Sequence, residues 1–194
     1  MVTVSTSKSP PSSYHHGDLH SALLAAGLVA LQTTAFADLS LRQLARNVGV
    51  SATAVYRHFP DKQALMQALA SEGIDQLGQF QKLAAEGAAN PDEAFAATGR
   101  AYVRFALAHP ALFRLIFSQC EPVGSTIFGN NLASQMLQDK ASLATKGDPA
   151  DTQKLMIQAW SLVHGLAMLM LDKQLPTDLA LIDRVIGQTT FKPL

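Results

Sequence analysis

The sequence predicts an all-α fold. Along nearly all of the 194 residues, apolar side chains recur three and four positions apart, which is the spacing of one face of an α-helix. No segment alternates polar and apolar residues for long enough to predict a β-strand. A hydrophobic content of 48% is sufficient for a buried core and excludes a disordered chain.

The first two helices are predicted from apolar spacing and from a capping pattern. Leucine and alanine residues recur at helical spacing over about 18–33. A second helix is expected at about 40–47. There the Ser40 hydroxyl can accept a hydrogen bond from the amide of residue 43, while the Gln43 side chain reaches back to the amide of Ser40. This arrangement is a capping box.

The third and fourth helices are separated by a proline. A helix over about 51–58 should stop before Pro60, because proline forces the preceding residue out of helical angles. The next helix starts at Asp61 and contains few helix-breaking residues up to about residue 85. It is the longest helix that the sequence predicts.

Prolines also mark most of the remaining helix starts. Asn90 precedes Pro91 and two acidic residues, which combines an N-cap, a first-turn proline and favourable charges at the positive end of the helix dipole. His109-Pro110, Asp148-Pro149 and Leu175-Pro176 mark further boundaries. The remaining expected helices span about 91–108, 111–118, 126–145, 149–171 and 178–187.

Composition excludes several classes of protein. The 15 basic and 15 acidic residues give zero formal charge at pH 7, so net charge offers no argument for a nucleic-acid partner. A single cysteine, Cys120, cannot form an internal disulfide, which suits a reducing cytoplasm. The polar residues 1–13 lack the apolar core of a signal peptide, and the longest apolar stretch, 162–171, is shorter than the ~20 residues that span a bilayer. We therefore expect a soluble intracellular protein with no membrane partner.

Residues 39–65 are typical of a helix-turn-helix. Two short helices meet across residues 47–50, and Gly49 can supply the positive φ that such a turn needs. Ala45 is small where the two helices would cross. The same geometry also occurs as ordinary helix packing, so these residues alone leave DNA binding and a structural role both open.

The second helix of this motif carries side chains that suit DNA. It has hydroxyl groups, an imidazole and a guanidinium but no acid, so none of its side chains would repel phosphate. Residues 1–66 hold five basic and three acidic residues, whereas residues 67–194 hold 10 and 12. The zero net charge therefore divides into +2 on the segment with the motif and −2 on the remainder.

Residues 14–66 also hold several residue types at fixed spacing. The segment opens with Tyr14-His15-His16-Gly17-Asp18-Leu19, continues with Leu44-Ala45-x3-Gly49-Val50, and ends with Ser51-x4-Tyr56-x-His58-Phe59-x2-Lys62-x2-Leu65. This pattern resembles the DNA-binding domain of the tetracycline-repressor (TetR) family of bacterial regulators. Trp160-Ser-Leu-Val-His164-Gly165 is similar to a C-terminal domain type of that family named for its Trp, His and Gly (WHG). The chain departs from many relatives by having Ala35, not glycine, before the aromatic Phe36.

The resemblance implies a function and a domain organisation. It implies a transcriptional regulator, most often a repressor, which a small-molecule inducer releases from a palindromic double-stranded DNA operator. The protein would act in the cytoplasm as a homodimer, without enzymatic activity or cofactor. We expect a flexible tail at residues 1–13, a helix-turn-helix domain at 14–60 and a ligand-binding and dimerisation domain at 61–194. The helix at 61–85 would connect the two domains.

Applied to this sequence, the family pattern also gives the residues expected to bind DNA. Ala52 and Thr53 would face base edges, where they favour contact with a thymine methyl group over bidentate recognition of guanine. Ser40 lies at a helix N-terminus, which favours phosphate. The full expected set is Ser40, Ser51, Ala52, Thr53, Tyr56, Arg57, His58 and Lys62.

The larger helical part holds enough aromatic surface to fill a core or to line a cavity. Any one of these residues is more often part of a core. The resemblance nevertheless implies an inducer pocket in this part of the chain. The residues expected to line it are Tyr102, Phe105, His109, Phe113, Phe117, Trp160 and His164.

The helix expected at 149–171 points to a second subunit. Between Trp160 and its end only Ser161 and His164 are polar, so this part is apolar all round and must be covered on both sides. The second side is covered either by the ninth helix or by another copy of the chain, and the resemblance favours the copy. The expected interface residues are Gly165, Ala167, Met168 and Leu171.

Two other patterns suggest different chemistry but are incomplete. His16 and His20 have the spacing of two metal ligands on one helix face, but no third ligand is evident near them. Cys120, together with His109, could suggest a nucleophile. The chain has no nucleophile elbow, phosphate loop or metal signature, so we expect neither an enzyme nor a metal site.

Overall fold

The computed structural model describes residues 16–118 and 129–187, and these residues form nine α-helices, one 3₁₀-helix and no strand. The predicted all-α fold is confirmed. The expected tail at 1–13, and Cys120, lie outside the described residues. The elements are α1 (His16–Ala30), η1 (Phe36–Asp38), α2 (Leu41–Val48), α3 (Ala52–His58), α4 (Lys62–Glu86), α5 (Pro91–Ala108), α6 (Pro110–Ser118), α7 (Leu132–Ala144), α8 (Pro149–Leu171) and α9 (Leu179–Val185).

Proline and capping signals located the helix ends well. Both α5 and α8 have the expected bounds, and the Asn90 side chain accepts hydrogen bonds from the first-turn amides of α5, as an N-cap should. The described part of α7 begins later than expected, at Leu132, because Asn131 caps it by accepting a hydrogen bond from the Ser134 amide. The 3₁₀-helix η1 was not predicted.

The predicted capping box of α2 is wrong. Ser40 occupies the N-cap position, but its side chain makes no capping hydrogen bond. Gln43 instead donates from Nε2 to Oδ1 of Asn47 at 2.9 Å, and its Oε1 accepts from Arg46. Both partners lie towards the C-terminal end of the helix, so the Gln43 side chain does not reach back to residue 40.

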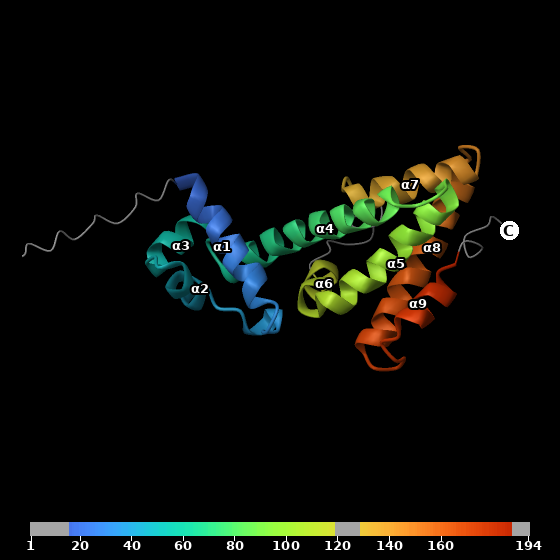
Figure 1. Cartoon of the computed structure of the whole chain (residues 1–194). Coiled ribbons are helices and arrows are strands. Elements are labelled where there is room, and N and C mark those ends of the chain that lie inside the picture. The colour runs from blue at the N-terminus through green and yellow to red at the C-terminus, as the bar shows by residue number, and fades with distance from the viewer. Residues whose placement is uncertain (1–15, 119–128, 188–194) are drawn as a thin grey trace, which may run out of the picture.

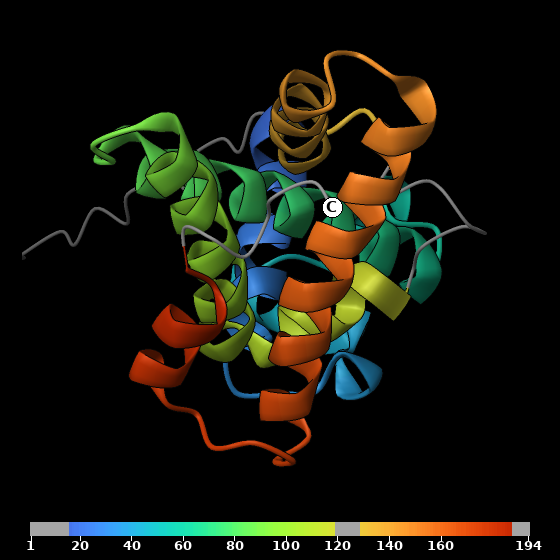
Figure 2. The ribbon, with the colours of Figure 1, turned by 90° about the vertical axis from the view of Figure 1, so that its right-hand side faces the viewer.

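The helices form two groups joined by α4. In Figure 1, α1, α2 and α3 lie together at one end of the molecule, and α4 runs from them along the remaining helices. It packs against α1 at its start and against α5, α6 and α7 farther along. Figure 2 shows α8 on the side remote from α1–α3. One continuous apolar core includes residues from both groups, with Leu65, Leu69 and Leu77 of α4 completely buried.

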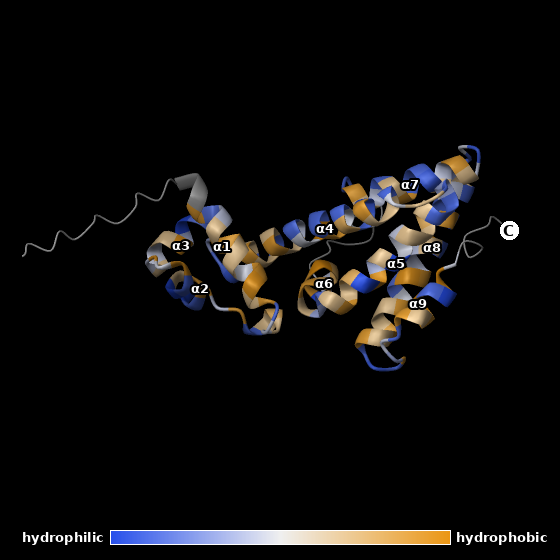
Figure 3. Ribbon diagram, viewed as in Figure 1, coloured by the Kyte–Doolittle hydropathy of each residue, from blue (hydrophilic) through white to orange (hydrophobic). Residues whose placement is uncertain are grey.

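Two glycines allow other helices to approach α4 closely. A Cβ at Gly73 would lie 2.8 Å from Cδ1 of Leu112 in α6. A Cβ at Gly78 would lie 3.2 Å from the backbone nitrogen of Ala133 in α7. Figure 3 shows α6 mainly in the colour of hydrophobic residues, as expected of a helix packed against α4 and α5. These contacts fix the positions of α6 and α7 around the second half of α4.

Helix α8 is long and apolar. Among the described residues it is the one helix whose length and hydropathy would allow it to cross a membrane, and 39% of its most apolar window is buried within the protein. Core helices of soluble proteins have the same properties. Here α8 packs against α5 and α7.

Candidate DNA-binding surface and ligand cavity

The turn between α2 and α3 has the geometry that the sequence predicts. Gly49 adopts φ 77° and ψ 30°, a left-handed conformation that a residue with a Cβ rarely adopts. The Val50 amide donates to the Ala45 carbonyl at 2.9 Å and closes the turn. Helix α3 then begins with Ser51 as its N-cap, whose Oγ accepts from the Ala54 amide at 3.2 Å. Residues 41–58 therefore form a helix-turn-helix.

The buried face of the motif determines which side chains of α3 point outwards. Val55 is buried in the core, and Phe59 is only 2% exposed, so Phe59 is a core residue, as expected. Tyr56 lies one position beyond Val55 on the helix and has an exposed ring. Of the residues expected to bind DNA, the exposed ones are Ser40, Ser51, Thr53, Tyr56 and Arg57, and the half-buried ones are Ala52, His58 and Lys62.

Two of these residues also hold the small group of helices together. The Lys62 ammonium donates a hydrogen bond to the Ala37 carbonyl in η1. The His58 ring lies edge-on to the His20 ring of α1, with centroids 6.1 Å apart, and His20 packs in turn against Phe59. An ammonium has three donors, so Lys62 can bind this carbonyl and still bind a phosphate.

The alanine at position 35 fits the local backbone. Ala35 has φ −63° and ψ 145°, which is ordinary extended backbone. A glycine is therefore not needed there. Helix α1 ends at Ala30 and is followed by a turn before η1, so the departure from the family pattern does not disturb the end of this helix.

A cavity of about 60 Å³ lies among α4, α5, α6, α7 and α8. Tyr102, Phe117 and Trp160, three of the seven residues expected in a ligand pocket, line it. None of the described residues that line it carries a charge. The other lining residues are Ile74, Leu77, Gln81, Phe95, Thr98, Gly99, Ala133, Ser134, Met136, Leu137, Ala159 and Val163.

A hydrogen-bonded aromatic group forms one wall of this cavity. Nε1 of Trp160 donates to the Tyr102 hydroxyl at 3.2 Å, and that hydroxyl lies 2.9 Å from Nδ1 of His164. Burial lowers the pKa of His164 below its ordinary value of 6.5, so the ring is neutral at pH 7. A neutral Nδ1 can accept the Tyr102 proton, which satisfies both groups.

The other four expected pocket residues lie elsewhere. Phe113 and His164 border a separate groove with Phe117, between α6 and α8. Phe105 and His109 pack against each other, with ring centroids 4.8 Å apart, and do not line the cavity. The reason is geometric, since the positions of α5 that face the cavity are those of Phe95, Thr98, Gly99 and Tyr102.

Sequence reasoning missed the polar residues of the cavity. Gln81 lies on the same face of α4 as Ile74 and Leu77, at helical spacing, and all three line the cavity. A glutamine in an otherwise apolar helical stripe was the signal that could have revealed it.

Two family models match most of this arrangement. The model described as bacterial regulatory proteins of the tetR family matches residues 23–69, and the tetracyclin repressor-like C-terminal domain matches residues 95–188. The chain belongs to the TetR family. Proteins of this family are DNA-binding transcription factors without enzymatic activity, and they bind operators and small molecules and form dimers.

Solved structures share the TetR fold. A protein of unknown function from Rhodococcus sp. RHA1 is 33% identical, with a TM-score of 0.75 over 93% of this chain and 96% of that one. A TetR-family transcriptional regulator from Streptomyces coelicolor is 19% identical, with a TM-score of 0.64 over 88% of this chain and 78% of that one, and supports the fold alone. No curated protein is similar enough to count as a match.

The surface of α8 differs in detail from the interface expected of a TetR-family dimer. Ala167 is completely buried within the protomer, so it is not available to a partner. Met168 and Leu171 are half-buried, and a Cβ at Gly165 would meet no atom within 4 Å. The exposed apolar residue near this end of α8 is Leu169. Helix α9 is only seven residues long and packs mainly on α5, so it leaves this face of α8 open.

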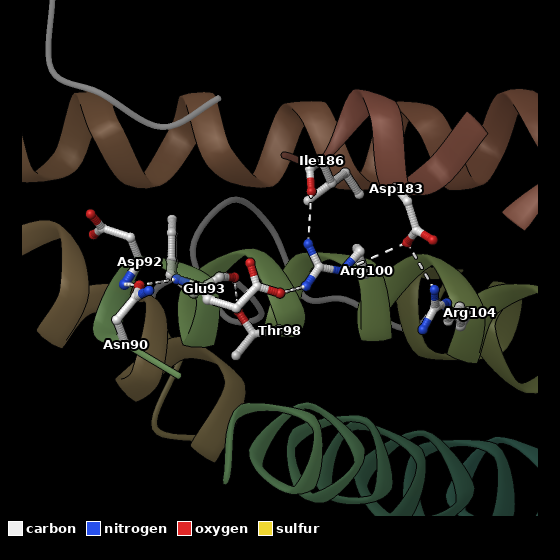
Figure 4. Close-up of polar contacts among 9 residues, drawn as sticks. Asn90, Asp92, Glu93, Thr98, Arg100, Arg104, Asp183 and Ile186 are labelled. Atoms are coloured by element: carbon white, nitrogen blue, oxygen red, sulfur yellow. Dashed lines mark hydrogen bonds and ion pairs between the residues drawn. The ribbon is translucent and has the colours of Figure 1, made fainter. Parts of the chain in front are cut away.

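An arginine on α5 holds α9 in place (Figure 4). Arg100 forms an ion pair with Glu93 and donates a hydrogen bond of 3.1 Å to the Ile186 carbonyl just after α9. Arg104, which the sequence left open as a ligand contact or an ion-pair partner, pairs with Asp183 of α9 at 2.8 Å. Neither arginine lines the cavity.

Proposed function

We propose that this TetR-family regulator is a repressor that a small molecule, bound in the cavity between α4 and α8, releases from a palindromic operator. The observation that carries the proposal is the helix-turn-helix, with an acid-free α3 that exposes Thr53, Tyr56 and Arg57. Such a helix fits the major groove of DNA, where hydroxyl and cationic side chains bind bases and phosphates. The regulator acts in the cytoplasm, where the DNA is.

In this proposal the DNA contacts divide into two kinds. Ala52 and Thr53, at the start of α3, face base edges and select thymine methyl groups. Residues around them bind phosphate and fix the position of the helix. The phosphate contacts are Ser40, Ser51, Tyr56, His58 and Lys62, and Arg57 is long enough to reach either phosphate or base. Residues 14–60 form the DNA-binding domain, and residues 61–194 form the ligand-binding and dimerisation domain.

The proposed dimer forms through α8. Ile157, Ser161, Gly165 and Leu169 follow one another at four-residue spacing along the side that the protomer leaves open. Small residues in the middle of this stripe permit close contact with a second α8. Two protomers then place their α3 helices in successive major grooves, about 34–36 Å apart, which requires a near-palindromic operator.

Helix α4 couples the two sites. It begins at Lys62, beside the proposed phosphate contacts, and Ile74, Leu77 and Gln81 of the same helix line the cavity. A ligand that prefers a different position of α4 moves the DNA-binding group with it. The change in operator affinity is limited by the difference in ligand affinity between the two conformers.

The test is a mobility-shift and protection assay on DNA flanking the gene, repeated with fractionated metabolites. The proposal expects sequence-specific retention, protection of a near-palindrome, and release by at least one fraction. Absence of specific retention would identify a helical ligand carrier instead of a regulator. Metabolite-strengthened retention would indicate a co-repressor mechanism and contradict release by an inducer.

A further inference from the structure

Gln81 places an unsatisfied oxygen in the wall of the cavity. The residue is 8% exposed, and its Nε2 donates to the Thr98 carbonyl at 3.1 Å. Because a carbonyl can only accept, the amide nitrogen must face Thr98, which fixes the position of Oε1. Within the described part of the chain, Oε1 of Gln81 is buried and accepts no hydrogen bond.

Such an oxygen requires a donor. Buried polar side-chain atoms are nearly always hydrogen-bonded, and leaving one unsatisfied costs about 1–3 kcal/mol. No described residue supplies this donor, and two polar neighbours already have partners. The Thr98 hydroxyl donates to the Phe95 carbonyl at 2.7 Å, and the Tyr102 hydroxyl is bonded to Trp160 and His164. The donor therefore comes from a molecule that enters the cavity, which is either water or part of a ligand.

The rest of the cavity wall determines what else the ligand can carry. The described lining residues are mostly apolar and all uncharged. His164, which bonds to Tyr102 in the wall, stays neutral because burial lowers its pKa. A charged ligand would lose its hydration and gain no opposite charge, which is strongly unfavourable.

We propose that the cavity binds an uncharged, mainly apolar molecule with an O–H or N–H group that donates a hydrogen bond to Oε1 of Gln81. This inference rests on the proposed function, in which the cavity is the effector site, and it adds the chemical class of the effector. Gln81 then determines specificity, because a ligand of the same shape without the donor leaves the buried oxygen unsatisfied.

The chain contains its own reporter of cavity occupancy. Trp160 is the only tryptophan in the sequence, and it lines the cavity, so its fluorescence responds to a bound molecule. Three probes have the same number of non-hydrogen atoms and no interfering absorbance: n-heptanol, hexyl methyl ether and hexanoate. The first is a neutral donor, the second lacks the donor, and the third is an anion.

Titration of the wild-type protein with these probes tests the inference. We expect n-heptanol to bind roughly tenfold more tightly than the ether, the ratio that one net hydrogen bond supplies, and hexanoate to bind more weakly than either. Equal binding of alcohol and ether would mean that water satisfies Gln81 and would overturn the inference. Preferential binding of hexanoate would overturn it as well.

Replacing Gln81 tests the role of this residue directly. In Gln81→Met the preference for alcohol over ether should fall to about onefold, because methionine has a similar length but no amide oxygen. The matched control is Gln76→Met on the same helix, since the Gln76 side chain binds Glu72 and does not line the cavity. The control should keep the wild-type preference. A retained preference in Gln81→Met contradicts the assignment, and if that variant does not fold, the wild-type comparison decides alone.

The fluorescence results do not depend on DNA, so the two proposals can fail separately. If n-heptanol binds as expected but no metabolite fraction releases the operator, the release mechanism is wrong and the cavity chemistry stands. If a charged metabolite releases the operator and quenches Trp160 while n-heptanol does not bind, the cavity chemistry is wrong and the release mechanism stands.

Discussion

Arg100→Met should lower the free energy of unfolding by about 2–3 kcal/mol, because it removes an ion pair within α5 and a charged hydrogen bond from α5 to the carbonyl just after α9. The Arg100 side chain is 15% exposed and its partner Glu93 is 28% exposed, so water replaces the lost contacts poorly. The Arg100 guanidinium also donates to the Ile186 carbonyl at 3.1 Å, and its Nε lies 3.7 Å from Oδ1 of Asp183. Methionine keeps most of the apolar part of the arginine side chain, so the decrease in the free energy of unfolding measures the loss of the polar contacts.

Arg104→Met is the matched control for this prediction. Arg104 lies one turn farther along α5, is 42% exposed and pairs with Asp183. An exposed pair contributes about 0–1 kcal/mol, so this variant should be nearly neutral. Urea unfolding followed by circular dichroism measures both variants, at one protein concentration because dimerisation adds to apparent stability. Equal losses in the two variants, or a loss at Arg100 below about 0.5 kcal/mol, would refute the reasoning.

Three further predictions test the DNA surface, the dimer and the half-buried His164. Lys62→Met should weaken binding to every DNA sequence, and the slope of log binding constant against log salt concentration should fall by about one. Lys82→Met, at the far end of α4, should change neither the affinity nor the slope. An unchanged slope in Lys62→Met would mean that Lys62 does not contact phosphate. Gly165→Leu should dissociate the dimer in sedimentation while the protomer stays folded, since its Cβ meets nothing within 4 Å; a variant that still sediments as a dimer would place the interface elsewhere. Burial lowers the pKa of His164 below 6.5, so the unfolded chain takes up its proton at a higher pH than the folded protein does, and the free energy of unfolding should fall as pH drops below 6.5. His164→Gln should flatten that fall in urea unfolding measured between about pH 7.5 and about pH 5, and an unchanged profile would assign it to other groups.

Local signals allowed most of the fold to be predicted. Asn90-Pro91 and Asp148-Pro149 mark the starts of α5 and α8 because capping and proline geometry depend only on neighbouring residues. Gly49 marks the turn for the same reason. The capping box at Ser40 failed because Gln43 had competing partners on its own helix, a choice that the motif does not encode.

The cavity could be predicted only in part, because it depends on how five helices cross. Tyr102 and Phe105 are three residues apart on α5, yet only Tyr102 lines the cavity, while Phe105 packs against His109 and Phe80. Aromatic content identifies candidates but does not say which neighbour each one meets. Gln81 was missed because aromatic content points to aromatic residues and not to a polar residue on an apolar helix face.

Helix α4 has a consequence for how this protein can evolve. Lys62 and Gln81 are separated by about 28 Å along one helix, at ~1.5 Å per residue, and no described residue belongs both to the cavity wall and to the exposed face of α3. Substitutions at the cavity can therefore change which molecule is detected without altering the DNA sequence that is recognised, and the reverse also holds. After gene duplication, one of the two regulators can come to bind a different small molecule and still bind the same operator, provided that α4 stays intact.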